Sequence, residues 1–426
     1  MLAYQPFLKL AGACALLAIT GVSLASCGDR CRALPAAKTA GWEAGDEREP
    51  TGTSTDSRIK GAGEQSWALA LDLLRITDPG EHPSIASSPA SMTFGLGLAY
   101  ARWPQACHGT ILAAIHALES GDALHQTLGA SIRELGSRAR EQGPEGEDPI
   151  AIHLRPSTWT LGGDGGVEPA ENPVHEIYGA TPNQVARPDT DERRGAVREV
   201  INCTIEEQSQ GLLVDFMPPE YPRSDTTSFD VNVAVLTGPW ESAFEDYGAE
   251  DFFLDDGTVA SQDMIGVTTA PALYYETERL VAVSVPLRER ELSVMLVMPR
   301  EGAFADLAAF TADVTLGELQ AAREEALDTL VDLTMPRFTV DSTTIEYSKE
   351  LGLMCDMYTL RDVLHGAAIE IDEHGIKAAA ATVVESWDTS SPEGLYVLIN
   401  RPFLFFAYDH ETDFVLFSGR YAGPKG

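Results

Sequence analysis

Ser57 and Lys60 have the Ser-x-x-Lys spacing with which a lysine activates a serine nucleophile in penicillin-binding enzymes. That chemistry needs the serine at the buried start of a helix. The surrounding segment is instead poor in large apolar residues, so we interpret the spacing as chance. The sequence contains no Gly-x-Ser-x-Gly, His-Glu-x-x-His, P-loop or complete Gly-x-Gly-x-x-Gly motif. We therefore predict that the protein is not an enzyme.

Cysteine and glycine patterns give no metal or cofactor site either. The cysteines include no Cys-x-x-Cys pair and have no His-x-x-x-His companion, so we expect no metal and no cofactor. We interpret most of them as small buried thiols. The alternative for two of them is a single disulfide bridge, if the protein is in an oxidising compartment. Gly162 to Gly166 is typical of a surface loop. The six cysteines are Cys14, Cys27, Cys31, Cys107, Cys203 and Cys355.

The composition limits the function classes. The chain has 426 residues, of which 44% are hydrophobic, enough to bury the core of one large domain or two smaller ones. The formal net charge is −35, so the average surface repels DNA, RNA and other polyanions. We therefore exclude nucleic acid as a partner and interpret the acidity as a solvated surface.

The N-terminus has the pattern of an export signal. Lys9 precedes an apolar run from Leu10 to Leu24, which is short for a membrane span and typical of a secretory signal. The run ends in Leu24-Ala25-Ser26-Cys27, which resembles the lipobox of bacterial lipoproteins. The resemblance implies that residues 1–26 are a signal peptide and that Cys27 carries a lipid anchor. The open alternative is an ordinary signal peptide cut near Ala25.

After Cys27 the composition predicts a tether and then one folded domain. Residues 27–63 are rich in Gly, Ala, Thr and acidic residues, which is typical of a flexible acidic tether. We expect the folded domain to span residues 64–426.

Apolar periodicity predicts helices in the first half of that domain and strands in the second. Ser88-Pro89 has the form of a helix start. Helices before strands favour an α+β fold over a doubly wound sheet. The expected helices cover 67–74, 88–100, 108–118, 125–142 and 193–208. The expected strands cover 231–235, 281–285, 293–298, 330–340, 395–399, 403–408 and 414–418, with a turn at 409–413.

The segment from Glu373 to Trp387 has the most informative pattern. If it is a strand, its small uncharged residues share one face, and the charged residues Lys377 and Glu385 lie on the other. Such a strand could enter between two existing strands without displacing a packed core, and Pro and Gly are absent from 376–391. A surface helix is the alternative, because four alanines favour it. The uncharged face comprises Ile376, Ala378, Ala380, Thr382 and Val384.

This segment resembles the hinge of the reactive loop of serpins, in which Glu-x-Gly is followed by small residues. The resemblance extends over nearly all of 64–424. It implies three β-sheets, mainly antiparallel or mixed, with about eight to nine helices and an exposed reactive-centre loop. Ser88, Pro89 and Ser91 match the start of the family's shutter helix and His365 its shutter histidine. Further matches are Asn232 with Gly238-Pro239-Trp240 at the breach, Pro336-Arg337-Phe338, Arg401 to Phe405 and Phe417 to Arg420.

The family's mechanism implies a single-use inhibitor of serine or cysteine endopeptidases. The protease cleaves the loop, and the freed hinge then inserts into the central sheet; serpin loop insertion is a known case of this behaviour. The implied hinge residues are Glu373, Gly375, Ile376, Lys377, Ala378, Ala379, Ala380, Ala381 and Thr382. Counting from Gly375 places the reactive bond at Thr389-Ser390, within a window from Asp388 to Ser391. Thr389 suggests an elastase-like or subtilisin-like target.

Three departures from the family pattern bear on inhibition. Ile376 replaces a small polar residue, Lys377 replaces an acidic one, and the stretch between Cys355 and His365 is short. The alternative is a non-inhibitory protein of the same fold that acts as a protease substrate, binding module or chaperone. We expect a monomer that is exported and anchored at the periplasmic face or cell surface, with an extracellular location as the other possibility.

Overall fold

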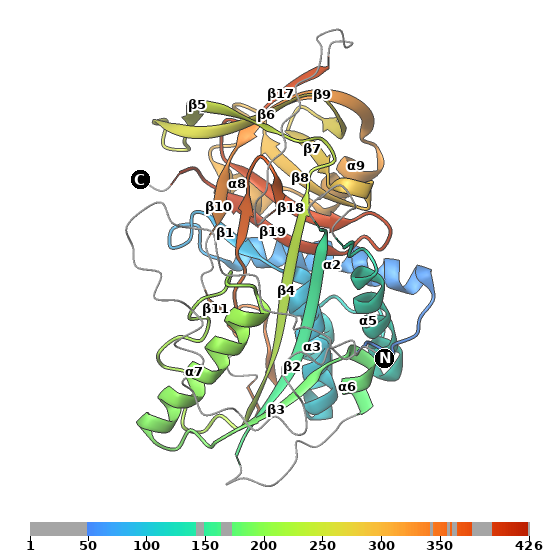
Figure 1. The fold of residues 1–426 in the computed structure, drawn as a ribbon, viewed down its shortest axis with the longest axis vertical. Helices are drawn as coiled ribbons and strands as arrows, with labels where there is room; N and C mark the ends of the chain where they lie inside the picture. The colour runs from blue at the N-terminus through green and yellow to red at the C-terminus, as the bar shows by residue number, and fades with distance from the viewer. Residues whose placement is uncertain are drawn as a thin grey trace, which may run out of the picture. The chain divides into compact units, whose positions relative to one another are not determined.

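The computed structural model describes residues 49–141, 149–162, 173–340, 344–355, 358–359, 364–376 and 394–424. Helices dominate the first half of these residues and strands the second, although β1 to β3 already occur before residue 190 (Figure 1). Their eight α-helices are α2 (Asp56–Ile76), α3 (Pro89–Arg102), α4 (Gln105–Ala114), α5 (Gly121–Gly136), α6 (Pro173–Tyr178), α7 (Asp191–Gln208), α8 (Leu307–Asp313) and α9 (Leu316–Glu324).

The larger sheet has nine strands and two portions joined by the long strand β6. This strand bends at Thr269, where φ is 55° and the register with β9 shifts. It pairs with β5 before the bend and with β7 after it. The sheet order is β1 (Ile85–Ser87), β19 (Val415–Tyr421), β18 (Phe403–Asp409), β8 (Leu292–Pro299), β7 (Leu280–Pro286), β6 (Val259–Glu276), β9 (Leu327–Pro336) and β17 (Leu395–Leu398), with β5 (Glu245–Phe253) beside β6.

The second sheet has six strands and both parallel and antiparallel pairs. Strand β2 pairs antiparallel with β4 and parallel with β3. Together with the two portions of the larger sheet it gives the three sheets expected, so the predicted α+β fold class is confirmed. The order is β10 (Phe338–Val340), β15 (Ile369–Ile371), β16 (Gly375–Ile376), β4 (Ser228–Pro239), β2 (Ala151–Leu161) and β3 (Thr181–Val185).

Two short pairs complete the strands of the described residues. One joins β11 (Ile345–Glu346) to β14 (Leu364–His365), and the other joins β12 (Met354–Cys355) to β13 (Tyr358–Thr359).

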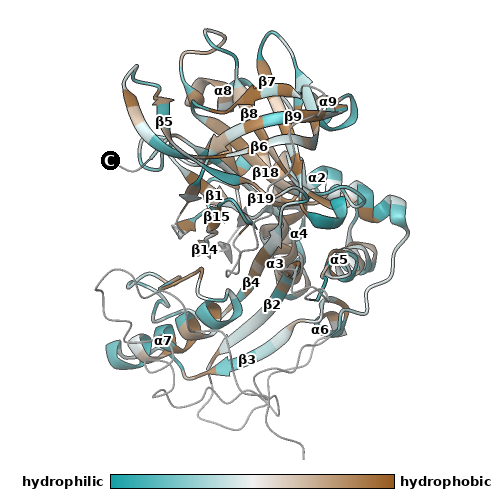
Figure 2. Ribbon diagram, turned by 45° about the horizontal axis from the view of Figure 1, so that its top comes forward, coloured by the Kyte–Doolittle hydropathy of each residue, from teal (hydrophilic) through white to brown (hydrophobic). Residues whose placement is uncertain are grey.

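Helices cover both faces of the six-stranded sheet. Alternate residues of β4, among them Val233 and Val235, pack with Ile201 of α7 on one face. Leu236 lies on the other face in the main core, which includes the apolar residues of α3. Figure 2 shows α7 with both hydrophilic and hydrophobic residues, as expected of a helix with one face on the sheet. The period of two along β4 therefore places one set of residues under α7 and the other against α3.

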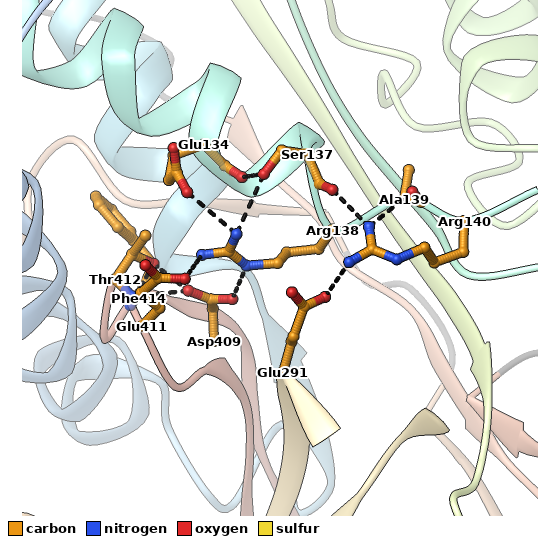
Figure 3. A network of polar contacts seen from close by, with 10 residues as sticks. All are labelled: Glu134, Ser137, Arg138, Ala139, Arg140, Glu291, Asp409, Glu411, Thr412 and Phe414. Atoms are coloured by element: carbon orange, nitrogen blue, oxygen red, sulfur yellow. Dashed lines mark hydrogen bonds and ion pairs between the residues drawn. The ribbon is translucent and has the colours of Figure 1, made fainter. Parts of the chain in front are cut away.

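The chain leaving α5 is fixed by a network of arginines and carboxylates (Figure 3). Arg138, which is 5% exposed, contacts the fully buried Asp409 at 2.8 Å and Glu411 at 2.8 Å. Arg140 contacts Glu291 at 2.6 Å. Because a buried carboxylate is stable only when paired, this network ties the segment before β2 to the turn between β18 and β19.

Structure packed against the domain is present ahead of the expected boundary at Glu64. Helix α2 starts at Asp56, and Gly52 N donates to Ile177 O at 3.2 Å. A Cβ at Gly52 would lie 2.5 Å from Ala130 N, so glycine is needed for this close approach. The prediction of a flexible tether is therefore wrong for residues 49–63. Small residues in this segment, such as Gly52, allow the chain to pack closely against α5.

Several other expectations need correction. Helix α5 ends at Gly136, not at Gln142, because the chain turns there toward β2. Strands β2, β3, β5 and β6 were not expected. Cys107 and Cys203 are buried and each forms a disulfide bond, so these two are not among the buried thiols expected for most of the cysteines. Lys60 lies in α2 within 3.4 Å of Asp413, which agrees with a chance Ser-x-x-Lys spacing.

Candidate functional site

A tight turn after β15 sends the chain back into the six-stranded sheet. Asp372 Oδ1 accepts hydrogen bonds from His374 N at 2.8 Å and Gly375 N at 3.2 Å, and Asp372 N donates to Gly375 O. Gly375 has φ 151°, and a Cβ there would lie 2.0 Å from Gly238 O. Glycine is therefore required at this position for the turn to form against β4.

The two residues after the turn occupy the space between β15 and β4. Ile376 pairs antiparallel with Ile371 on one side and with Gly238 on the other, while Gly375 pairs with Pro239. Strand β16 is thus a short strand that joins the two halves of the sheet. Two residues of the predicted hinge, Gly375 and Ile376, are thus already part of the sheet.

Ile376 fits this position in spite of its size. Its side chain is 2% exposed and belongs to the main core. The residue directly opposite on β4 is Gly238, which has no side chain. The atoms nearest to where its Cβ would lie belong to Ile150 and Leu287, which form part of the same core as Ile376.

Trp240 closes the same end of the sheet. Its indole Nε1 donates to Asp372 O at 2.9 Å, and its backbone N donates to His374 O at 3.1 Å. Phe244, whose ring centroid is 5.4 Å from that of Trp240, donates its backbone N to Glu373 O at 3.2 Å. Trp240 is 4% exposed, so the turn is held by buried bonds to the end of β4.

Glu373 adds a charged contact on the far side of the turn. Its Oε2 lies 2.8 Å from Arg337 Nη2, between β9 and β10. The two side chains are 26% and 37% exposed, so water screens part of the attraction.

A second cluster lies at the first turn of α3. Ser88 is the N-cap of this helix: its hydroxyl accepts from Ser91 N at 3.1 Å and donates to Leu416 O at 2.6 Å. Pro89 occupies the first helical position, as the sequence predicted. The cap therefore fixes the start of α3 against β19.

His365 reaches this turn from β14. Its Nε2 accepts a hydrogen bond from Ser88 N at 2.9 Å, so the neutral ring carries its proton on Nδ1. The side chain is 6% exposed, and burial lowers the pKa of the imidazole to about 4. His365 is therefore neutral at pH 7 and acts here as an acceptor.

Asn232 reaches the same turn from β4. Its Nδ2 donates to Ser91 O at 3.3 Å, and Ser91 Oγ donates to Asn232 O. Its Oδ1 is buried and has no hydrogen-bond partner among the described residues. Asn232 thus binds α3 and retains one buried acceptor in the sheet.

The remaining predicted site residues lie outside the described residues. They are Lys377, Ala378, Ala379, Ala380, Ala381 and Thr382 of the hinge, Asp388, Thr389, Ser390 and Ser391 at the reactive bond, and the lipidation residue Cys27. Sequence reasoning gave no role to Asp372, Arg337 or Phe244. The Asp-x-x-Gly spacing of 372–375, a known turn signal, was the signal available for the first of these.

Within the described ranges, we find no group of three or more His, Cys, Asp or Glu side chains arranged to hold a metal ion. No helix in the same ranges is long and apolar enough to span a membrane.

Comparison with known sequences agrees with the resemblance. A family model described as Serpin (serine protease inhibitor) matches residues 64–424. The chain is 29% identical over 251 residues to Serpin B3 of Homo sapiens, covering 53% of this chain and 63% of that protein. It is 24% identical over 370 residues to an uncharacterised serpin-like protein of Thermococcus kodakarensis, covering 81% and 82%. The match to the human relative thus spans less than two thirds of its length.

Solved structures show the same fold. The thermophilic serpin tengpin in its native state has a TM-score of 0.72 at 18% identity, covering 92% of this chain and 100% of that one. Thyroxine-binding globulin in complex with thyroxine has a TM-score of 0.67 at 17% identity, covering 85% and 99%. At these identities the likeness concerns the fold alone.

Proposed function

We propose that this chain, which belongs to the serpin family of protease inhibitors, is a single-use inhibitor of serine or cysteine endopeptidases. A target protease attacks the carbonyl carbon of the reactive bond, proposed as Thr389-Ser390 within the window from Asp388 to Ser391. The peptide bond breaks, Ser390 takes up the proton of the nucleophile and leaves as a new amino terminus, and Thr389 stays bound to the protease as an ester of its serine or a thioester of its cysteine. The freed hinge then extends β16 as a complete strand.

One observation carries this proposal: β16 is paired with β15 and β4 at once. An inserting strand needs a neighbour on each side, because an unpaired backbone group buried in a sheet is unfavourable. Ile376 already has both neighbours and Gly375 pairs with β4, in the antiparallel sense that a strand returning from β15 must take. The residues that follow them would add ladder bonds alternately to β4 and to β15.

The sequence of the hinge supports the next step. Ala378, Ala380, Thr382 and Val384 have the same parity as the buried Ile376, so an extended strand turns these small or apolar side chains toward the core. Lys377 and Glu385 have the opposite parity. A charge is therefore not forced into the core, where it would lack a partner.

The proposed targets follow from the residue before the cleaved bond. Thr389 is small and uncharged, which suits the primary pocket of an elastase-like or subtilisin-like protease. Cleavage after Asp388 would need a basic pocket. Trypsin-like proteases, which need a basic residue there, are disfavoured.

The test is formation of a covalent complex. Incubation of residues 28–426 with an elastase-like or a subtilisin-like protease should give a complex that survives SDS. The variant Ala380→Arg should be cleaved without forming the complex, since it buries an unpaired charge in the core. The control Ala379→Arg has the opposite parity and should keep most of the complex. Cleavage of the wild type without any complex would favour the non-inhibitory alternative, a protease substrate or binding protein of the same fold.

We further propose that the protein is an exported lipoprotein anchored through Cys27 at the periplasmic face or the cell surface. Support comes from the apolar run of 10–24 and the Leu-Ala-Ser-Cys sequence that follows it. Several acyl chains on one residue anchor a protein stably, whereas a single chain does not. Cys27→Ala should release the protein from the membrane fraction without stopping export, and unchanged membrane association would contradict the anchor.

A further inference from the structure

A cavity lies between α2, α3 and the start of α5, away from the six-stranded sheet. Its volume is about 170 Å³. Apolar side chains form much of its lining, including Ala62, Ile115, Leu124 and Leu128. Leu118, which is 70% exposed, lines it where the chain passes from α4 to α5. The cavity therefore offers an apolar volume that a ligand can reach.

Thr93 is a buried polar group of this lining. It is 4% exposed, and its Oγ1 has no hydrogen-bond partner among the described residues. A threonine in a helix usually bonds a carbonyl one turn earlier, as Thr311 does with Leu307 O at 2.7 Å. A buried hydroxyl without a partner is unfavourable, because it has lost its hydrogen bonds to water. A bound molecule with one polar group would remove that penalty.

The charges around the cavity favour a neutral ligand. Arg58, the cation among its lining residues, is ion-paired with Glu119. Glu119 Oε2 also accepts from Thr127 Oγ1 at 2.6 Å. An anion would have to compete with Glu119 for the arginine, and a cation would compete with the arginine for Glu119.

The size limits the ligand further. An apolar cavity of about 150 Å³ holds one benzene molecule. We propose that this cavity is a binding site for a neutral, phenol-sized amphiphile, one ring or a short chain with a single hydroxyl, whose oxygen hydrogen-bonds Thr93 Oγ1. This site shares no lining residue with the candidate inhibitory site. Its test needs neither a protease nor the reactive loop, so the two proposals can fail separately.

The test compares phenol with benzene on the full chain. Phenol should bind with a dissociation constant on the order of 1 mM, a limit set by its few atoms. Titration calorimetry gives the affinity, and methyl NMR shifts should be confined to Ile115, Leu124 and Leu128. Benzene should bind about fivefold more weakly, because it cannot bond to Thr93.

The variant Thr93→Val keeps the shape and removes the hydroxyl. It should lower phenol affinity about fivefold and leave benzene affinity unchanged. Thr311→Val, which removes a hydroxyl outside the cavity, should change neither. Ala62→Leu should weaken both ligands by filling the space, which provides a second measurement if Thr93→Val folds poorly. Equal affinities of the wild type for phenol and benzene, phenol binding unchanged in Thr93→Val, or the absence of saturable binding would each overturn the proposal.

Discussion

Strand β4 and the segment that carries β14 and β15 are linked in different ways at two places: at β16, here called the upper end, and at the first turn of α3, here called the lower end. At the upper end the two sides are joined directly, because Ile376 of β16 pairs with both and lies opposite Gly238. At the first turn of α3 each side bonds to the helix separately, His365 to Ser88 and Asn232 to Ser91. The upper end is thus filled by strand and side chain, whereas the lower end retains a buried acceptor, Asn232 Oδ1. The difference indicates that an inserting strand would start at the upper end and would gain a hydrogen bond to Asn232 at the lower end.

The largest effect is expected at the upper end, from Gly375→Ala. A Cβ there would lie 2.0 Å from Gly238 O and 2.8 Å from Pro239 Cα, and backbone cannot move aside cheaply. We expect β16 to leave the sheet, with a loss of roughly 3 kcal/mol in the free energy of unfolding. The midpoint of urea unfolding, compared with that of the wild type, measures this loss of stability.

The matched control is Gly352→Ala. Gly352 also has a positive φ, 65°, but no atom lies within 4 Å of its would-be Cβ, so the variant reports backbone strain alone. It should lose about 1 kcal/mol. Equal losses in the two variants would mean that contact with β4 does not hold the turn.

The next effect concerns the lower end and depends on pH. The pKa of His365 is about 4 in the folded protein and about 6.5 when unfolded, so between these values the unfolded chain binds more protons. Stability supplied by the neutral ring is complete above pH 6.5 and is lost as the pH falls toward 4, by about 3 kcal/mol. Unfolding measured across this range should show that loss.

The variant His365→Gln separates this histidine from others. The amide oxygen of glutamine can still accept from Ser88 N, but it does not titrate. Burial also lowers the pKa of His125 and of His410, so part of the pH dependence should remain. A slope identical to that of the wild type would show that His365 is not the group that destabilises the lower end in acid.

A smaller effect follows from continuing the register of β16 downward. Ile376 lies opposite Gly238 in an antiparallel pair. Counting six residues forward from Ile376 and six residues back from Gly238 therefore places Thr382 opposite Asn232 in the loop-cleaved form. The threonine hydroxyl can then donate to Asn232 Oδ1. Thr382→Val should reduce the gain in melting temperature on loop cleavage, by an amount equivalent to about 1 kcal/mol.

The control Thr382→Ser keeps the hydroxyl and should restore most of that gain. An effect of Thr382→Val that persists in an Asn232→Ala background would contradict this register, since the two residues would then act independently.

Local signals explain which parts of the fold were predictable. The apolar runs that became β7, β8, β18 and β19 are buried almost throughout, so composition alone reveals them. Ser88-Pro89 begins α3 because the cap and the fixed proline φ are both local.

Strand β2 shows why other elements were missed. It contains His153, Arg155 and Pro156, which disfavour a strand when read alone. The strand exists because β4 pairs along its length, while β3 begins to pair only at Ser157 and leaves an open edge beside the proline. At the candidate site, likewise, parity predicted that Ile376 faces inward, but the residue with which it pairs, Gly238, is far away in the sequence.

The smallest effect tests whether charge or packing holds the upper end. Glu373 and Arg337 are partly exposed, so their ion pair should contribute roughly 0.5 kcal/mol in a double-mutant cycle of Glu373→Gln and Arg337→Gln, measured by urea unfolding. The coupling should fall further in high salt, because screening acts on exposed charges. The steric closure at Gly375 should not respond to salt. A coupling near 2 kcal/mol, insensitive to salt, would reverse the comparison: the turn would then be held by a desolvated charge pair, and the match of Ile376 to Gly238 would be secondary.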